Sequence, residues 1–356
     1  MARGKYEKRP EPKFKKTNSG GNKTNRILLR VMIVLLSILL VLLIVAAVAM
    51  NYVFGKIGRY DTDEEATQTT SSDFVEFETD ATEEGQESID PSDVTWETVE
   101  KIEKSEEIIN ILLIGQDARP GEGRARSDTM ILVSLNEKTN TIQMTSFMRD
   151  MYVQIPGYLD NRINAAFVLG GPELLNSTLN VNFGVEIDGN VEVNFDAFSE
   201  IVDILGGVDI ELDWEETGYM NNRGHAVSQG MNHLNGEAAL DFARMRMVSG
   251  GDYGRTERQR EVIAAIMTSL KNAKLTDLLD LVNQVLPYVT TDLTDAEIIS
   301  YATKGLNALG KGAEIRSARI PADDAHYGTF INGMSVLVPD LKMCQEDLKE
   351  FIYGEE

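Results

Sequence analysis

Arginines and aspartates recur in short clusters along this chain, and they are its residue types best suited to chemistry. The clusters lie at 116–119, 124–129, 149–150, 244–246 and 252–259. The planar fork of arginine matches phosphate oxygens and does not lose its charge, whereas aspartate oxygens suit a hard divalent cation such as Mg²⁺. The combination predicts a site for a metal-bound pyrophosphate.

Each cluster also has an ordinary structural explanation. An aspartate near a strand end, such as Asp128, commonly caps a turn. The neighbours Arg149 and Asp150 can form a surface ion pair that stabilises little, and Arg244 and Arg246 can be solvated charges at a helix C-terminus. The joint occurrence of the clusters at element ends, in a chain of net charge −23, favours a shared site.

Three predicted strands must position the first clusters. Residues 108–115 form a nearly continuous apolar run that ends in glycine, which is typical of a strand buried on both faces. Residues 130–135 and the alternating segment 141–147 predict two more strands, joined by a polar turn. A central sheet is therefore expected, with charged clusters at the strand ends.

A strand and helix follow in the second half of the chain. Residues 191–195 predict a strand that leads into a helix capped by Asp196 and stopped by Gly206 and Gly207. A further strand is expected at 208–212. These elements lie between the early clusters and the later ones.

Two later helices place the remaining arginines. Asn235 is a predicted N-cap for a helix over 236–243. Arg244 and Arg246 then stand two residues apart, a spacing that shares one side of an extended segment but no helix face, so the helix is expected to end there.

The last cluster is expected at a helix N-terminus. A helix from about 256 to 272 places Arg255, Arg258 and Gln259 at its first turn. Free N–H groups and the helix dipole already favour anions there. The three side chains strengthen the interpretation of a phosphate site.

The N-terminal 50 residues predict membrane attachment. Residues 31–50 carry no charge, and at about 1.5 Å per residue they can cross a hydrocarbon core of roughly 30 Å. Residues 1–30 hold ten Lys and Arg against two Glu, so the positive-inside rule predicts a cytoplasmic N-terminus and an extracytoplasmic remainder. The alternative is a signal peptide cleaved at the small residues 47–49.

Composition limits what lies outside the membrane. Residues 51–106 are acidic and poor in apolar side chains, which predicts a mostly disordered stalk before a folded domain at 107–356. The single cysteine, Cys344, excludes an internal disulfide, and three scattered histidines offer no zinc-ligand spacing. The acidic outer part argues against a nucleic-acid partner.

The order of these motifs resembles the LytR-CpsA-Psr family, over roughly residues 108–272. The motifs that carry the resemblance are Gly115-x-Asp117-x-Arg119, Arg126-Ser127-Asp128-Thr129, Arg149-Asp150, Arg162-Ile163-Asn164, Gly206-Gly207-Val208, His233-Leu234-Asn235-Gly236-Glu237, Arg244-x-Arg246 and Gly251-Asp252-x-Gly254-Arg255-x-x-Arg258-Gln259. The resemblance implies an α/β fold, with a central mixed sheet flanked by helices, behind one membrane span.

The resemblance also implies a reaction and a set of roles. The reaction is transfer of a glycopolymer from a polyprenyl-pyrophosphate carrier to peptidoglycan, with formation of a phosphodiester. Asp117 and Asp128 would hold Mg²⁺ or Mn²⁺. The residues implied for the pyrophosphate clamp are Arg126, Arg149, Arg244, Arg246, Arg255 and Gln259. Arg119 and Arg258 are supporting candidates, and Asp150 or Asp252 is a candidate general base.

Three questions stay open on the sequence alone. The apolar segments 163–169, 174–175 and 278–286 either line the polyprenyl channel that the resemblance implies or pack in the core. A lipid-pyrophosphate hydrolase would use the same aspartates and arginines with water as the acceptor. A non-enzymatic envelope regulator would keep the topology without needing the metal site.

Overall fold

The computed structural model describes residues 54–60, 88–116, 124–271 and 284–354. Lys56–Glu356 form one compact unit. The predicted cytoplasmic tail 1–30 and membrane helix 31–50 lie outside the described residues. Among the helices of the described ranges, none combines the length and apolarity that crossing a membrane requires.

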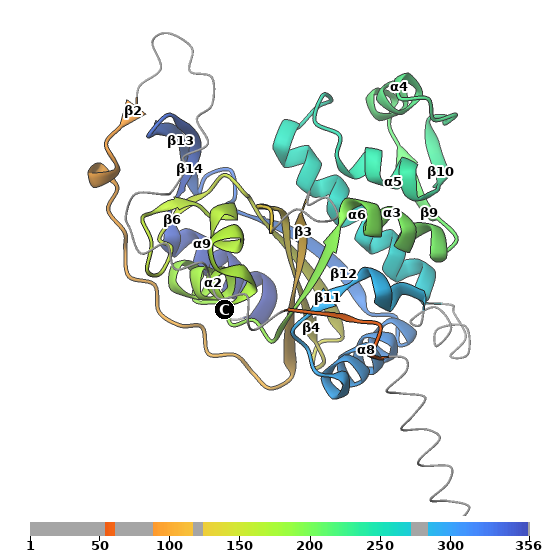
Figure 1. The fold of residues 1–356 in the computed structure, drawn as a ribbon, viewed down its shortest axis with the longest axis horizontal. Coiled ribbons are helices and arrows are strands. Elements are labelled where there is room, and N and C mark those ends of the chain that lie inside the picture. The colour runs from red at the N-terminus through yellow and green to blue at the C-terminus, as the bar shows by residue number, and fades with distance from the viewer. Residues whose placement is uncertain (1–53, 61–87, 117–123, 272–283, 355–356) are drawn as a thin grey trace, which may run out of the picture. The chain divides into compact units, whose positions relative to one another are not determined.

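A mixed seven-stranded sheet forms the centre of this unit (Figure 1). Its strands, in spatial order, are β1 Gly58–Arg59, β11 Thr290–Thr291, β8 Gly189–Asn194, β3 Ile108–Gln116, β4 Ser127–Asn136, β5 Thr141–Phe147 and β12 Glu314–Ile320. Strands β3, β4 and β5 form an antiparallel meander, while β8 runs parallel to β3 and β12 parallel to β5. The predicted α/β class and central sheet are confirmed.

Helices cover both faces of the sheet, which explains the continuous apolar run of β3. On one face Leu112 and Met130 pack with Phe167 of α2 (Asn164–Phe183) and with α9 (Leu341–Leu348). On the other face Ile109 and Leu135 pack against α8 (Asp295–Gly310). Figure 1 shows α2 and α9 on the opposite side of the sheet from α6.

A second layer lies on the α6 side. It comprises α3 Phe195–Ile204, β9 Val208–Leu212, α4 Trp214–Asn222, β10 Gly230–Leu234, α5 Gly236–Ala243 and α6 Gly251–Leu270. Strands β9 and β10 form a separate antiparallel pair. Val202, Phe242 and Val262 join α3, α5 and α6 in one buried cluster, and α6 also contacts β5 and β12.

Two predicted helix starts are wrong. Helix α3 is capped by Asn194, whose side chain accepts from the N–H of Ala197 at 2.8 Å; Asp196 instead lies in the first turn, where its charge complements the dipole. Helix α6 begins at Gly251, about five residues before the predicted start. Gly250 adopts a φ of 90°, so the chain turns there. Arg255 and Gln259 consequently lie beyond the first turn.

The domain takes in part of the predicted stalk. Ile57 is buried, Ile102 is 1% exposed, and the ring of Trp96 lies 6.1 Å from that of Tyr152. These apolar residues are few in an acidic segment, so composition alone did not reveal them. The folded unit therefore includes residues 56–60 and 88–106, which differs from the predicted boundary at 107.

Smaller elements complete the unit around α9. The three-stranded sheet contains β2 Ser88–Ile89, β13 His326–Ile331 and β14 Met334–Pro339, and a short ladder joins β6 Tyr152–Val153 to β7 Asn161–Arg162. The helical turns are η1 Pro91–Asp93, η2 Leu286–Tyr288 and η3 Lys349–Tyr353.

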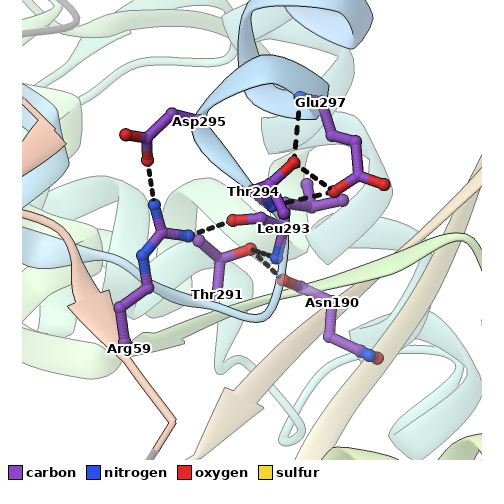
Figure 2. A network of polar contacts seen from close by, with 7 residues as sticks. All are labelled: Arg59, Asn190, Thr291, Leu293, Thr294, Asp295 and Glu297. Carbon is purple, nitrogen blue, oxygen red and sulfur yellow. Dashed lines mark hydrogen bonds and ion pairs between the residues drawn. The ribbon is translucent and has the colours of Figure 1, made fainter. Parts of the chain in front are cut away.

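A polar network ties the first strand to the sheet edge (Figure 2). Arg59 of β1 donates to the carbonyl of Leu293 and to the carboxylate of Asp295. Thr294 and Glu297 cap α8 reciprocally, with the Thr294 N–H donating to the Glu297 carboxylate at 2.8 Å. Strand β1 is thus held at one edge of the central sheet.

Candidate functional site

The first half of the site forms where β4 begins and β5 ends. These strands are antiparallel neighbours, with Ile131 opposite Ser146, so the start of one and the end of the other meet at one edge. Asp128 is the second residue of β4, and Arg149 follows β5. Nη1 of Arg149 donates to Oδ1 of Asp128 at 2.5 Å. The sheet therefore unites two residues that are 21 positions apart.

The second half forms at the start of α6. Oδ1 of Asp252, in the first turn, lies 3.4 Å from Nε of Arg246 and also 3.4 Å from Nε of Arg255. Gly250 supplies the left-handed turn that brings the Arg246 loop back against the helix. One carboxylate thus holds two arginines side by side.

The two halves act on each other electrostatically. Burial, together with the charges of Arg149 and Arg246, lowers the pKa of Arg255 to about 10, against the opposing charges of Asp252 and Asp128. The side chain of Arg255 is only 4% exposed. A buried guanidinium held among other cations favours an arriving anion.

Arg149 lies in a more acidic environment. Its own burial would lower its pKa, but the charges of Asp150, Asp128 and Asp252 outweigh that effect and hold the pKa above its usual value. Burial also raises the pKa of the Asp150 carboxyl, against the charges of Arg149 and Arg162. The site is a network of several ion pairs with alternating charges and not a single ion pair.

Several polar atoms in this network of ion pairs lack a hydrogen-bond partner. Within the described residues, the buried Nε atoms of Arg149 and Arg255 donate no hydrogen bond, and Oδ1 of Asp252 accepts none. Buried polar atoms are normally paired, since an unpaired one costs about 1–3 kcal/mol. The two Nε atoms face aspartate oxygens only at ion-pair distances of 3.6 Å for Arg149 and 3.4 Å for Arg255, so a phosphate oxygen would supply the hydrogen bonds that they lack.

The remaining predicted clamp residues occupy neighbouring elements. Arg244 ends α5, and its guanidinium lies 4.4 Å above the ring of Phe195. Arg126 is half-buried in the segment just before β4, and Gln259 is half-buried one turn after Arg255 on α6. Arg126 thus precedes the strand that carries Asp128, and Gln259 lies on the helix that carries Arg255, whereas Arg244 ends a separate helix.

Arg258 contacts Glu216 and Ser249 and none of the aspartates described above. Its Nε donates to Oε1 of Glu216 at 2.7 Å, and its Nη2 donates to the carbonyl of Ser249 at 3.3 Å. The side chain therefore braces the loop after α5 instead of facing Asp252.

Arg162 is a residue to which the sequence analysis gave no role. Its Nε lies 3.7 Å from the Asp150 carboxylate, and its Nη2 donates to the carbonyl of Ser335 at 2.6 Å. The motif Arg162-Ile163-Asn164 was visible, but only the fold brings it beside Asp150. Arg162, Arg149, Asp150, Asp252 and residues 335–337 line a cavity of about 580 Å³, within the usual range for a ligand pocket.

The family model LytR_cpsA_psr matches residues 67–350, most of the chain. The chain belongs to the LytR_cpsA_psr family. The resemblance stated from the motifs is confirmed, and the match begins well before the predicted domain boundary at 107.

Named relatives of this LytR_cpsA_psr protein differ in their descriptions. It is 36% identical over 222 residues to the polyisoprenyl-teichoic acid–peptidoglycan teichoic acid transferase TagU of Bacillus mycoides (strain KBAB4), covering 61% of this chain and 70% of the relative. It is 32% identical over 252 residues to the regulatory protein MsrR of Staphylococcus aureus (strain COL), covering 68% and 74%.

Solved structures share the fold of this family member. TagT bound to LI-WTA has a TM-score of 0.57 at 26% identity, covering 72% of this chain and 96% of that one. TagV of B. subtilis gives 0.57 at 26% identity, covering 70% and 99%. The mixed sheet with flanking helices is therefore the architecture of these proteins.

One of the two predicted metal ligands, Asp117, lies outside the described residues. The supporting candidate Arg119 also lies outside them. Within the described ranges, no three His, Cys, Asp or Glu side chains gather as a metal site would require. Asp128 presents one carboxylate, whose Oδ1 is taken by Arg149. A single carboxylate is compatible with Mg²⁺, which usually takes one or two carboxylates together with phosphate oxygens and water.

The apolar segments considered for a lipid channel have a structural use in this family member. Ile163, Phe167 and Leu175 are fully buried in the main hydrophobic core. Core packing, the alternative interpretation, accounts for these side chains. Residues 278–283 lie outside the described ranges.

Proposed function

We propose that this protein transfers a glycopolymer from a polyprenyl-pyrophosphate carrier to peptidoglycan. A hydroxyl of the acceptor attacks the phosphorus next to the polymer, the bond from that phosphorus to the polyprenyl phosphate breaks, and the hydroxyl proton passes to a base. The name of the TagU relative supports the reaction class. The observation that carries the proposal is the pair formed by the half-buried Arg149 and the buried Arg255, whose Nε atoms donate no hydrogen bond within the described residues.

The arginines have the role that such a reaction demands. Phosphoryl transfer depends on alignment and on neutralising charge that builds on phosphate oxygens. Arg255 is fixed by Asp252 and Arg149 by Asp128, so both guanidiniums are oriented before the donor arrives. Preorganised charge of this kind does not need to rearrange during the reaction.

Asp128, together with Asp117, would hold Mg²⁺ or Mn²⁺. The metal would supply charge neutralisation on the pyrophosphate. Asp150 is the better candidate base of the two aspartates, because burial raises the pKa of its carboxyl and it lines the cavity. Its contacts with Arg149 and Arg162 would hold it in place.

The proposal includes the membrane topology. Residues 1–30 would lie in the cytoplasm, 31–50 would span the membrane, and the folded unit would lie outside, near its carrier lipid. The acidic residues after 50 would keep the linking segment extended. The polyprenyl donor and peptidoglycan would be the partners.

The test uses the full chain in detergent micelles, a labelled glycan on a polyprenyl-pyrophosphate donor, and peptidoglycan. The expected result is labelling of peptidoglycan that depends on Mg²⁺ and is lost in Arg149→Ala and Asp128→Ala. The matched control is Arg316→Ala, which removes an exposed arginine paired with Glu314 and should keep wild-type activity.

Two outcomes would replace the proposal. Release of free glycan phosphate without labelled peptidoglycan would favour the hydrolase. No turnover of an authentic donor would favour a regulator, the description carried by the MsrR relative.

A further inference from the structure

A second, larger cavity lies on another side of α6. Its volume is about 1300 Å³, and it is lined by α6, by the β9–β10 pair, by Arg319 of β12, and by Ala322 and Asp323 after that strand. Gly250 and Tyr253 line both this cleft and the smaller cavity that contains Arg149. Only the first turn of α6 therefore separates the two.

One wall of the cleft is acidic. Glu216, Glu257 and Glu261 line it. Partial burial raises the pKa of the Glu261 carboxyl, and the charges of Glu216 and Glu257 raise it further. Glu216 is paired with Arg258, but carboxylates outnumber arginines in the lining of the cleft. A cation placed there would be stabilised.

Another part of the lining carries two arginines. Arg260 is 7% exposed; its Nη1 donates to Ser146 at 2.8 Å, whereas its buried Nε donates to no acceptor within the described residues. Arg319 lies 4.0 Å above the ring of Tyr253, and its charge lowers the pKa of Arg260, which burial already lowers. Arg319 also donates to the exposed carboxylate of Asp323, so a ligand carboxylate would take the place of that partner and share the charge of Arg260.

We propose that this cleft binds the peptide part of the acceptor, a glycopeptide that carries both a side-chain ammonium and a carboxylate. The ammonium lies against Glu257 and Glu261, and the carboxylate faces Arg260 and Arg319. This inference rests on the proposed function, since it assigns the acceptor of that reaction to a place on the protein.

The chemistry of the cleft excludes other occupants. An alkyl chain would remove several charged groups from water without pairing them, which is costly. A nucleic acid would meet an excess of carboxylates. A peptide with both signs of charge satisfies both walls at once.

The shared wall explains how the acceptor meets the donor. The hydroxyl of Tyr253 is hydrogen-bonded to Nε2 of His326 at 2.8 Å, and Nδ1 of His326 is 2.8 Å from the carbonyl of Ala322. Tyr253 is thus held in place between the cavities. Its neighbour Asp252 lines the smaller cavity, and Glu257 lies five residues further along α6, so a sugar attached to the bound peptide would extend along the first turns of the helix towards the donor.

The first test is calorimetric binding of a disaccharide-pentapeptide with a free lysine amine to the full chain in detergent micelles. The matched probe is the same molecule with that amine acetylated. Acetylation should weaken binding to wild-type protein by about tenfold, the loss of one charged contact. Glu261→Gln should weaken binding of the free amine by a similar factor, and acetylation should then have little further effect.

Two further variants keep the test specific. Glu257→Gln changes an exposed residue of the same wall and should act like Glu261→Gln. Glu200→Gln changes an exposed glutamate of α3 outside the cleft lining and should bind as wild type does. Equal affinity of wild type and Glu261→Gln, additive effects of substitution and acetylation, or no binding of the free amine would each overturn the inference.

Transfer kinetics separate this inference from the proposed function. If both hold, Glu261→Gln raises the acceptor KM by about tenfold and leaves the donor KM and kcat near wild type. Amine-dependent binding without any transfer would refute the proposed function and keep the binding site. Normal transfer by Glu261→Gln with an unchanged acceptor KM would refute the binding site in the cleft and leave the proposed function standing.

Discussion

The two cavities beside α6 use the same residue types in different proportion: two arginines and two aspartates line the smaller one, whereas carboxylates are in excess in the larger one. In the smaller cavity, the carboxylates of Asp150 and Asp252 each lie within 3.7 Å of two arginines. In the larger cleft, carboxylates outnumber arginines. The contacts of Asp150 and Asp252 with four arginines make the surroundings of the smaller cavity favourable for a polyanion, whereas the larger cleft suits a ligand of both signs.

Helical geometry makes this division possible within one element. Asp252, Arg255 and Gln259 follow at three and four residues and so share a face of α6, while Glu257, Arg260 and Glu261 share another. A single helix thus presents different charges to two cavities. The comparison leads to four predictions, ordered from the largest effect to the smallest.

The strongest test of the cationic side is Arg255→Met. Loss of a preorganised donor should lower kcat for transfer by about 10²–10³-fold. The melting temperature should not fall, because the buried charge is unfavourable, as its lowered pKa indicates. Steady-state kinetics and thermal unfolding of the same preparation check both parts. A stable variant with near-normal kcat would remove Arg255 from the site.

Arg258→Ala tests the ion pair between Arg258 of α6 and Glu216 of α4. Arg258 and Glu216 are both largely buried, so removal of one partner should lower the free energy of unfolding by about 3–5 kcal/mol. Urea unfolding measures this change. Arg258→Ala with Glu216→Gln should recover part of the loss, and a lone substitution that costs less than about 1 kcal/mol would contradict the bracing role.

Tyr253→Phe tests the side chain that lines both cavities. The ring stays beneath Arg319, but the hydrogen bond to His326 is lost. The expected cost is about 1 kcal/mol, which corresponds to a fall of about 2–4 °C in the melting temperature. A tenfold fall in kcat at unchanged stability would instead give the hydroxyl a chemical role.

Glu261→Gln should alter the pH dependence of stability by the smallest amount. The folded-state pKa of Glu261 is raised above its ordinary value of 4.5, so the folded state binds the proton more tightly. Wild-type stability from this group is present below pH 4.5 and is lost as pH rises through the folded pKa. The variant should lack that decline.

The side chain of Glu261 is partly exposed, so its effect should stay below about 1 kcal/mol. Melting temperatures of both proteins between pH 4 and 7 give the comparison. Parallel curves would mean that the acidic wall is neutralised by its neighbours.

Local pattern was sufficient for the parts of the fold that repeat within a few residues. The apolar run of β3, the alternation of β5 and the cap at Asn235 were all predicted and are present. Each depends on the burial period or on one hydrogen bond near in sequence. The charged clusters were visible for the same reason, since their residues are adjacent.

Choices between similar residues close in sequence were less certain. Asn194 and Asp196 are both residue types that favour the N-cap. Asn194 is the cap because its backbone is extended where the helix begins. The start of α6 depended on the left-handed turn at Gly250, which a pattern of glycines alone does not locate.

The sequence by itself determined the residue types of the site, the central strands and the family. Only the tertiary structure placed Arg149 on Asp128, directed Arg258 to Glu216 instead of Asp252, set Arg162 beside Asp150 and opened a second cleft behind Tyr253. The reason is physical: periodicity and capping act over one or two turns of chain, whereas ion-pair partners and cavity walls depend on which distant elements pack together.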